Sequence, residues 1–321
     1  MSEKPEGYVN LDPEHLDASH IKTQTKATQI PPAPTQAEIE AANIPEPTEL
    51  RTPMAQASYS RLDYYKNCPL AFKFKYVDRL APLQEPEHKD KFGNVKPPGW
   101  QRGSIIHQAM DDYINSRTNV LRPELYDLRF ELNEARQLKI DEPERILTEQ
   151  NKFFDFDYNL IDMDALTDDE KGVTSAGDPC PSNYHVLVII DLLIFNEDFT
   201  HATIVDLKSG KVYPVKHAAQ TQLYALFTAM EYPQVENVTT QLWYCDQSGK
   251  IVAKDFTRER ILMYFNFWHR SISRMHKDYK FLPSPHEQHC FFCEWGKIEH
   301  SNKWKNKTGN CELSLDKRDR I

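Results

Sequence analysis

Hydrophobic and polar positions along the chain follow two kinds of repeat, one helical and one strand-like. In QRGSIIHQAMDDYINSR, residues 101–117, apolar side chains recur every three to four positions, and the same period returns in residues 216–232. This period places the apolar side chains on one face of a helix, so we predict two amphipathic helices. The nearly continuous apolar runs at 184–195 and 201–208 are instead typical of two buried strands, and the turn-like NEDFT between them predicts a hairpin.

Shorter patterns surround these four elements. Ser60 is a candidate N-cap for a helix near the start of the apolar region, and Pro69 can open a second helix. Residues 238–247 predict another strand, and residues 257–277 predict a long helix. The order of helix, strands, helix, strand and helix predicts an α/β fold with a mixed central β-sheet flanked by helices. We expect a single domain over residues 58–321, ending in a segment that contains several cysteines.

Residues 1–57 have a different composition. Pro, Thr, Gln, Ala and Glu dominate there, and large apolar residues are scarce. Such a segment cannot bury enough apolar surface to offset its chain entropy, so we predict an acidic disordered tail, a candidate docking segment for a recombination or replication partner. The formal net charge of the whole chain is −9. This charge argues against a protein that coats nucleic acid nonspecifically, but not against a nuclease, because a metal site needs acids.

Composition also bounds the cellular setting. No apolar run reaches the roughly 18–20 residues that a membrane span needs, and the N-terminus lacks the basic-then-apolar pattern of a signal peptide. Six cysteines in 321 residues do not form the disulfide framework of a small secreted protein. We therefore expect a cytoplasmic protein, of a bacterium or a virus-infected cell, that does not bind membranes.

Three charged residues interrupt the two predicted strands. Asp206 and Lys208 lie two positions apart and so share one face, while Asp191 lies within the first apolar run, where an unpaired buried carboxylate is costly. Two explanations fit. One is a solvated hairpin with an Asp–Lys ion pair; the other is a pair of carboxylates that share a divalent metal beside a catalytic lysine. Mg²⁺ suits the second, because it takes oxygen ligands and retains waters that can attack a phosphodiester.

Several motifs occur in an order that resembles the PD-(D/E)xK nuclease superfamily. IID at 189–191, followed by DLK at 206–208, resembles the core signature of that superfamily. YSRLDYYKNCPLAFKFKYV, GSIIH and QTQLY resemble the N-terminal element, the Gly-x-x-x-His helix and the Gln-x-x-x-Tyr helix of its RecB-like branch. That branch includes AddB-type and CRISPR-associated four-cysteine nucleases. The resemblance spans roughly residues 58–295 and implies a restriction-endonuclease-like core.

The resemblance implies roles for individual residues. The ligands of Mg²⁺ or Mn²⁺ would be His107, Asp191, Asp206 and the backbone carbonyl of Leu207. Lys208 would be the catalytic base or would position the attacking water. Gln220 and Tyr224, one helical turn apart, would orient the site and contact DNA phosphate. His107 has a simpler alternative as an ordinary core or surface histidine, and Gln220 and Tyr224 have one as an ordinary helix flank.

Three further acids lie close to the signature in sequence. Glu149 resembles an acidic position that precedes the signature strands in the family. Asp155 and Asp157 also share a strand face, and we expect both to be solvated.

Four of the cysteines are candidate ligands of a second metal centre. Some relatives bind a [4Fe–4S] cluster through one N-terminal cysteine and three closely spaced C-terminal ones. Cys68, Cys290 and Cys293 match three of these positions, whereas Cys311 lies eighteen residues beyond Cys293 instead of only a few. Such a cluster would join the two ends of the domain. A zinc site completed by His289 or His300, or reduced thiols without metal, remain alternatives. We expect Cys180 in a loop and Cys245 in a strand, both without a metal role.

Together, these features predict a metal-dependent DNA nuclease, an exonuclease of recombination, repair or viral DNA processing. One alternative is an RNA-acting or guide-system nuclease with the same site, since no base-reading motif is visible in the sequence. The other is an inactive nuclease fold that serves as a DNA-binding or assembly subunit. The presence of Asp191, Asp206 and Lys208 argues against the inactive fold.

Overall fold

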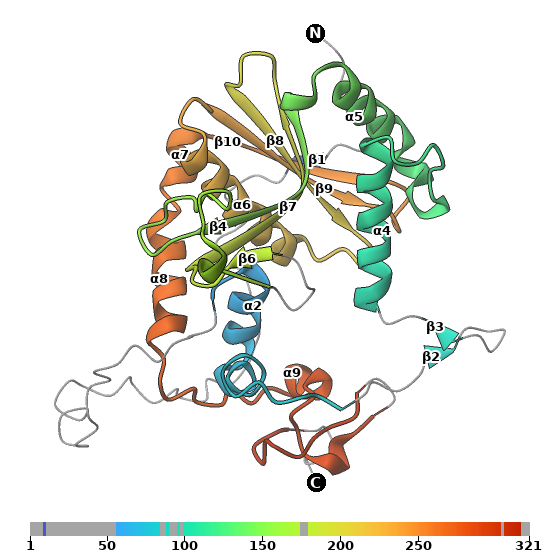
Figure 1. Ribbon diagram of the computed structural model, residues 1–321. Coiled ribbons are helices and arrows are strands. Elements are labelled where there is room, and N and C mark those ends of the chain that lie inside the picture. Colours follow the sequence, from blue (N-terminus) through green and yellow to red (C-terminus); the bar gives the residue numbers. More distant parts are fainter. Residues whose placement is uncertain are drawn as a thin grey trace.

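A six-stranded mixed β-sheet forms the centre of the molecule (Figure 1). The computed structural model describes residues 9–10, 56–83, 88–89, 95–96, 99–173, 179–302 and 305–315. In spatial order the strands are β1 (Val9–Asn10), β10 (Lys250–Thr257), β9 (Asn237–Tyr244), β8 (His201–Lys208), β7 (Val186–Phe195) and β4 (Ile146–Phe154). β8 and β9 are parallel, as are β1 and β10, and the other neighbours are antiparallel.

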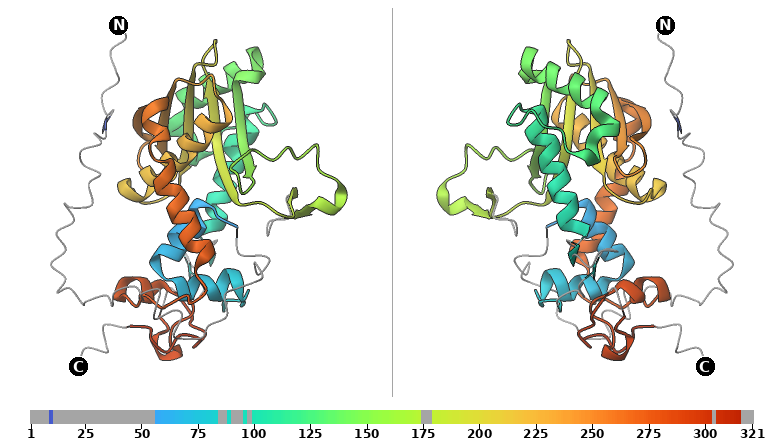
Figure 2. Two further views of the ribbon diagram at one scale, coloured as in Figure 1. Left: turned by 90° about the vertical axis from the view of Figure 1, so that its left-hand side faces the viewer. Right: turned by 90° about the vertical axis from the view of Figure 1, so that its right-hand side faces the viewer.

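Helices cover both faces of this sheet (Figure 2). α4 (Gly99–Ile114) and α5 (Arg129–Asp141) lie on one face, and α6 (Pro214–Glu231) lies on the other. Because parallel strands need a crossover connection, α6 links β8 to β9 across the sheet. The predicted α/β fold, a mixed sheet flanked by helices, is confirmed.

The alternation along β8 divides the apolar residues between two cores. Ile204 is buried with residues of α6, whereas Val205 and Leu207 are buried with Ile106 and Met110 of α4. The period of two in the sequence therefore matches the two faces of the strand. Asp206 and Lys208 lie at the end of β8, between the helix α4 on one face of the sheet and the helix α6 on the other.

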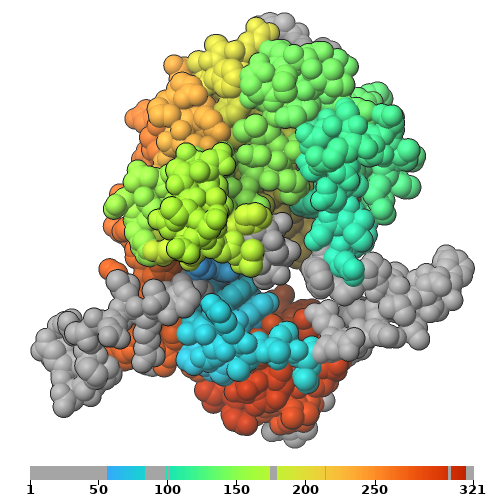
Figure 3. All heavy atoms as spheres, in the orientation of Figure 1, coloured from blue at the N-terminus to red at the C-terminus, as the bar shows by residue number. Residues whose placement is uncertain are grey.

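A smaller part of the molecule lies below the sheet and is built from both ends of the domain (Figures 1 and 3). It contains α2 (Tyr59–Asn67), α3 (Pro69–Phe72), the π-helical turn η3 (Lys73–Val77), α9 (Glu287–Phe292) and η7 (Ile298–His300). The Tyr64 hydroxyl donates to Glu294 Oε1 at 3.1 Å and accepts from Trp295 Nε1 at 3.1 Å. These bonds join the first ordered helix to the C-terminal segment.

Three local predictions were wrong. Ser58, not Ser60, caps α2, because its Oγ accepts from the Arg61 N–H and the helix begins at Tyr59. The helix expected over 257–277 is broken into α7 (Arg258–Leu262) and α8 (Phe265–Lys277). The break lets α7 contact α6 and β10 while α8 contacts α2. Cys180 lies in a short strand, not in a loop.

The sequence analysis also did not assign β10, α5 and α9. The remaining short elements are β2 (His88–Lys89), β3 (Val95–Lys96), η4 (Pro123–Leu128), η5 (Pro143–Arg145), η6 (Asp168–Glu170), β5 (Lys171–Val173) and β6 (Pro179–Pro181).

Most of the predicted tail, residues 1–8 and 11–55, lies outside the described residues, so its disorder and its partner stay predictions. The domain boundary near residue 58 also stays a prediction. Among the helices that the structure describes, none has the length and apolar character needed to cross a bilayer.

Candidate functional site

Three carboxylates lie in a row across three neighbouring strands. The pairing of Leu192 with Val205, continued by one residue, sets Asp191 of β7 opposite Asp206 of β8. The pairs Thr148↔Leu192 and Gln150↔Ile190 likewise set Glu149 of β4 opposite Asp191. The row therefore runs from Glu149 through Asp191 to Asp206.

The strands are irregular where this row crosses them. Ile190 and Leu193 are both buried in the core on the α6 side, whereas Leu192 is buried on the α4 side, so β7 changes face at Asp191. Glu149 opposite has a φ of 46°, a left-handed conformation that is uncommon for a residue with a Cβ. These irregularities coincide with the acids of the row, which indicates that they shape the site.

The side chain of Asp191 accepts a hydrogen bond from the backbone of β8, as a backbone carbonyl does elsewhere in the sheet. The paired residues of β7 and β8 end at Leu192 and Val205. One step further, Asp191 Oδ2 accepts the N–H of Leu207 at 2.7 Å. The Asp191 carboxylate is thus held at the edge of β8 by a hydrogen bond to its charged form.

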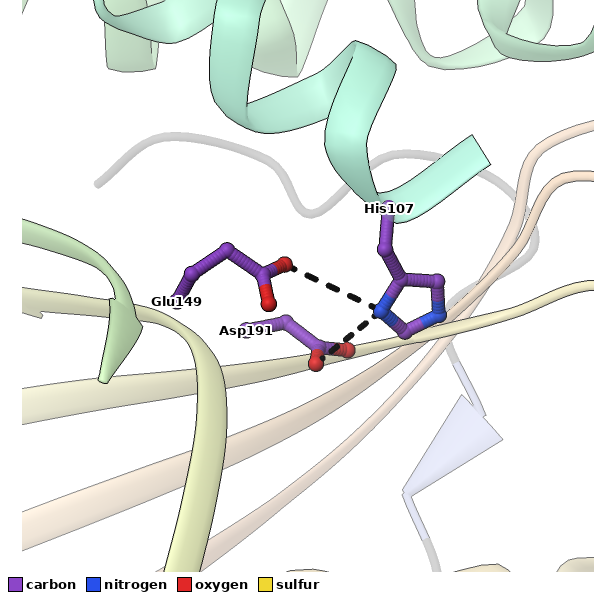
Figure 4. Close-up of side chains that lie close together, drawn as sticks. All are labelled: His107, Glu149 and Asp191. Carbon is purple, nitrogen blue, oxygen red and sulfur yellow. Dashed lines mark ion pairs between the residues drawn. The ribbon is translucent and has the colours of Figure 1, made fainter. Parts of the chain in front are cut away.

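His107 approaches the row from α4 (Figure 4). Its Nδ1 atom lies 3.1 Å from Asp191 Oδ1 and 3.9 Å from Glu149 Oε1. Each of these three residues offers one ligand atom, and the three atoms lie within 4.8 Å of one another. Across the described part of the chain, this is the only such group of three or more His, Cys, Asp or Glu side chains.

Polar contacts near both ends of α4 fix the position of His107. Near the start, Arg102 donates two hydrogen bonds to the Asp246 carboxylate, at 2.8 and 2.7 Å. Near the end, Asn115 Nδ2 donates to Thr148 Oγ1 at 2.8 Å, next to Glu149 on β4. The buried stripe of Ile106, Met110 and Ile114 packs between these two points.

A second chain of contacts starts at the other end of the row. Lys208 Nζ lies 2.6 Å from Asp206 Oδ2 and donates to Gln220 Oε1 at 3.0 Å. Gln220 Nε2 donates in turn to the Tyr224 hydroxyl at 2.6 Å. Asp206 and Tyr224 are buried, so this chain of contacts orients the Lys208 ammonium from within the protein.

The crowding of acids alters their pKa values. Burial, together with the charge of Asp191, raises the pKa of Glu149 to about 7. Burial also raises the pKa of Asp206 to about 6, although the Lys208 ammonium opposes the shift. Burial disfavours the charged imidazolium of His107, but the charge and hydrogen bond of Asp191 outweigh it and raise its pKa to about 9. Glu149 and Asp206 therefore bind protons more readily than ordinary carboxyl groups do.

The donor set fits a divalent cation. It combines carboxylate oxygens with an imidazole nitrogen, which suit Mg²⁺ or Mn²⁺. The buried Oε1 atom of Glu149 forms no hydrogen bond with any described residue, which leaves it available as a ligand. Of the predicted ligands, His107 and Asp191 are in the group within 4.8 Å, whereas Asp206 lies next to them in the row and contacts Lys208.

Sequence comparison identifies the family. A family model of the PD-(D/E)XK nuclease superfamily matches residues 56–298, most of the chain. The chain belongs to this superfamily. Thirteen chains of solved structures match; one, titled "Crystal structure of SSO0001", is 11% identical, with 80% of this chain and 87% of that chain covered and a TM-score of 0.34. A search among curated proteins found no match.

Membership of the PD-(D/E)XK superfamily indicates a metal-dependent nuclease that acts on nucleic acid. Asp191, Asp206 and Lys208, whose sequence context resembles the superfamily signature, lie on the neighbouring strands β7 and β8. Glu149 was not among the predicted metal ligands, although its resemblance to an acidic family position pointed to it. The structure places it beside His107 and Asp191.

The four candidate cysteine ligands line one cavity below the sheet. Cys68, Cys290, Cys293 and Cys311 all border a cavity of about 380 Å³. The Ser284 N–H donates to Cys68 Sγ at 3.5 Å. Burial raises the pKa of Cys293 to about 12, so the free thiol stays protonated.

The other residues considered for metal binding lie in different settings. His289 borders the same cavity, whereas buried His300 Nδ1 is 3.1 Å from Ser314 Oγ. Cys180 and Cys245 are buried elsewhere. Asp155 accepts the backbone N–H groups of Asp157 and Asn159 in a turn.

Proposed function

We propose that this chain is a DNA nuclease of the RecB-like branch, an exonuclease that acts in recombination, repair or viral DNA processing. The observation that carries the proposal is the row of Glu149, Asp191 and Asp206, with His107 and Lys208 beside it. An inactive descendant of the fold would be free to lose any of these groups, so their joint presence supports an enzyme.

We infer that His107, Asp191, Asp206 and the carbonyl of Leu207 hold Mg²⁺ or Mn²⁺, with Glu149 as a further ligand. A bound divalent ion would activate water and stabilise the charge that develops on the phosphodiester. Asp191 is already oriented for this role by the Leu207 N–H and by His107. Protons would compete with the cation for Glu149 and Asp206, so metal binding would be weaker at low pH.

Lys208 is the residue we assign to the water and the phosphate. Its ammonium has three N–H donors, and contacts with Asp206 and Gln220 use two of them. The third can donate to the attacking water or to a phosphate oxygen. Buried Tyr224 accepts a hydrogen bond from Gln220 and so holds the Gln220 side chain in place. Gln220 in turn accepts a hydrogen bond from Lys208 and orients its ammonium.

We further propose that the four cysteines hold a [4Fe–4S] cluster. With Zn–S bonds of about 2.3 Å, the sulfurs of a tetrahedral zinc site lie about 3.8 Å apart. Within the described residues, no three cysteine sulfurs lie within 4.8 Å of one another, although all four residues border one cavity. This wider spacing supports a cluster of several atoms over a single zinc ion. The amide of Ser284, bonded to Cys68 Sγ, is the kind of donor that stabilises a ligating sulfur.

Digestion of labelled nucleic acids tests the proposal. End-labelled single- and double-stranded linear DNA, closed circular DNA and RNA are incubated with Mg²⁺ or Mn²⁺, and Asp191→Asn serves as the inactive control. We expect the linear DNA to be degraded and circular DNA and RNA to persist. Degradation of RNA alone would support the RNA-acting alternative. DNA binding without any cleavage would identify an inactive subunit and refute the proposal.

Anaerobic purification tests the cluster separately. We expect a brown protein that contains iron and sulfide and that loses its colour in Cys290→Ser. A colourless, iron-free preparation that still digests DNA would reject the cluster while leaving the nuclease intact.

A further inference from the structure

The C-terminal segment folds around a buried lysine. Lys307 is only 1% exposed and is one of the largest fully buried side chains among the described residues. Its Nζ atom donates to the backbone carbonyls of Cys290, of Phe291 at 3.3 Å and of Cys293 at 2.9 Å. A lysine ammonium has three N–H donors, so this loop matches its full donor capacity.

A buried ammonium is costly unless its surroundings compensate its charge. The carbonyls of the Cys-x-x-Cys loop, which converge on Nζ, contribute to this compensation. Two of those carbonyls belong to Cys290 and Cys293, which both border the cavity. The lysine therefore fixes the backbone of the loop that carries two of the proposed ligands.

The protein makes room for the stem of this lysine. A Cβ at Gly296 would lie 3.0 Å from Lys307 Cδ and 3.1 Å from the Ser314 side chain. The absence of a side chain at Gly296 thus admits the buried lysine. This close packing shows that Lys307 occupies a fitted position and not a chance pocket.

The same segment also delivers the fourth cysteine. Backbone bonds run from Thr308 N to Glu294 O at 2.9 Å, from Gly309 N to Gly296 O at 2.8 Å and from Cys311 N to Trp295 O at 2.7 Å. The chain beyond Lys307 therefore runs beside the chain that follows Cys293. This pairing explains how Cys311 reaches the cavity despite its distance in sequence, and it accounts for the long spacing between the two cysteines.

We propose that Lys307 is a positioning residue for the iron–sulfur cluster, which it serves by shaping the Cys-x-x-Cys loop and by placing a positive charge beside the cluster. This inference rests on the proposed cluster. Four thiolate ligands bring negative charge into a partly buried site, and reduction of the cluster adds more. A nearby cation therefore stabilises the reduced form and raises the reduction potential.

Three substitutions separate the two parts of this role. Lys307→Met removes the donors and the charge, Lys307→Gln keeps amide donors but not the charge, and Lys307→Arg keeps both. Lys297→Met is the matched control, since half-buried Lys297 lies in the same segment and bonds to Ser314 Oγ through its backbone N–H. The variants are purified anaerobically as full-length chains, and their iron and sulfide content, optical spectrum and reduction potential are measured.

We expect Lys307→Met to lose most of its iron, and Lys307→Gln to keep a cluster that is harder to reduce. At a fixed potential the ratio of reduced to oxidised cluster should fall about tenfold in Lys307→Gln, a shift of about 59 mV for a one-electron couple. Lys307→Arg and Lys297→Met should both match the wild type. If Lys307→Met does not fold, the comparison of Gln with Arg still decides the role of the charge.

Two results would count against the inference in different ways. Iron-free wild-type protein would reject the cluster, and this inference with it. A wild type that holds iron, together with Lys307→Met or Lys307→Gln variants of unchanged iron content and potential, would reject the role of Lys307 alone. A Lys307→Arg variant that holds iron but shows the same lowered potential as Lys307→Gln would contradict the role assigned to the charge.

Discussion

The ammonium of Lys208 holds the most deeply buried acid of the site, and its removal gives the sharpest test of the proposed chemistry. Lys208 Nζ lies 2.6 Å from Asp206 Oδ2, and Asp206 is 2% exposed. In Lys208→Gln the carboxylate keeps its position but loses its cation. Breaking a buried ion pair from one side costs about 3–5 kcal/mol when the remaining charge stays uncompensated.

Protonation of Asp206 limits that cost in the metal-free variant. Burial already raises the pKa of Asp206 to about 6, and removal of the ammonium raises it further. Because the folded pKa lies above that of the unfolded chain, the folded state binds the extra proton, and stability is lost as the pH rises through this window. We therefore expect the destabilisation of Lys208→Gln to be small near pH 5 and larger near pH 8, as measured by denaturant unfolding in EDTA.

Turnover should fall far more than stability. Removal of one donor that stabilises transition-state charge typically costs about 10²–10³ in kcat, or about 2.7–4 kcal/mol. Single-turnover cleavage of labelled DNA with Mg²⁺ measures this loss, and fluorescence anisotropy with Ca²⁺ measures DNA binding. Lys211→Gln, which removes an exposed lysine from the loop after β8, is the control for charge. A folded Lys208→Gln protein that cleaves within threefold of the wild type would refute the role of this lysine.

Three further predictions follow from other parts of the structure. Saturating Mg²⁺ at about 100 times its Kd should add about 2.7 kcal/mol and raise Tm by roughly 5–10 °C, whereas Asp191→Asn should show no such shift. His217 is buried beside Tyr244, and burial with the charge of Lys208 lowers its pKa to about 4. Because the unfolded chain binds the proton first, the wild type should lose up to about 3 kcal/mol more than His217→Gln as the pH falls from 6.5 to 4; equal losses would contradict the buried neutral imidazole. Met110→Ala, at a fully buried position under α4, should cost about 2–5 kcal/mol in urea unfolding and weaken Mg²⁺ binding through His107; unchanged metal affinity would show that α4 does not transmit the loss.

Local patterns were sufficient to predict the parts of the site that depend on a regular repeat. A period of two placed Asp206 and Lys208 together, and a period near 3.6 placed His107 on a helix with a buried stripe. The opposition of Asp191 and Asp206 follows from the register of a short hairpin. In each case the position of the residue depends on the secondary structure of the residues around it in the sequence, so the local pattern is sufficient to predict it.

The features that the sequence did not reveal depend on exceptions to these repeats or on distant contacts. The family resemblance pointed to Glu149, but the positive φ of its backbone and the change of face of β7 at Asp191 were not predicted, because no residue type there signals such an irregularity. β10 was missed because Lys254 and Asp255 interrupt its apolar pattern. Cys311 reaches the cavity through backbone pairing of the chain around it with Glu294, Trp295 and Gly296, which no sequence pattern indicates.

The hydrogen bonds of the Tyr64 hydroxyl affect how the protein folds during translation. It bonds to residues that lie 230 and 231 positions later in the chain. A ribosome adds about 5–20 residues per second, so the partners of α2 emerge roughly 10–50 s after α2 itself. During that interval the rings of Tyr64 and Tyr65 can already pack against Tyr76 and Phe72, but the Tyr64 hydroxyl lacks both of its native partners. Because contacts of such high sequence separation form slowly, α2 should be joined to the C-terminal segment only late in folding, after that segment has been translated.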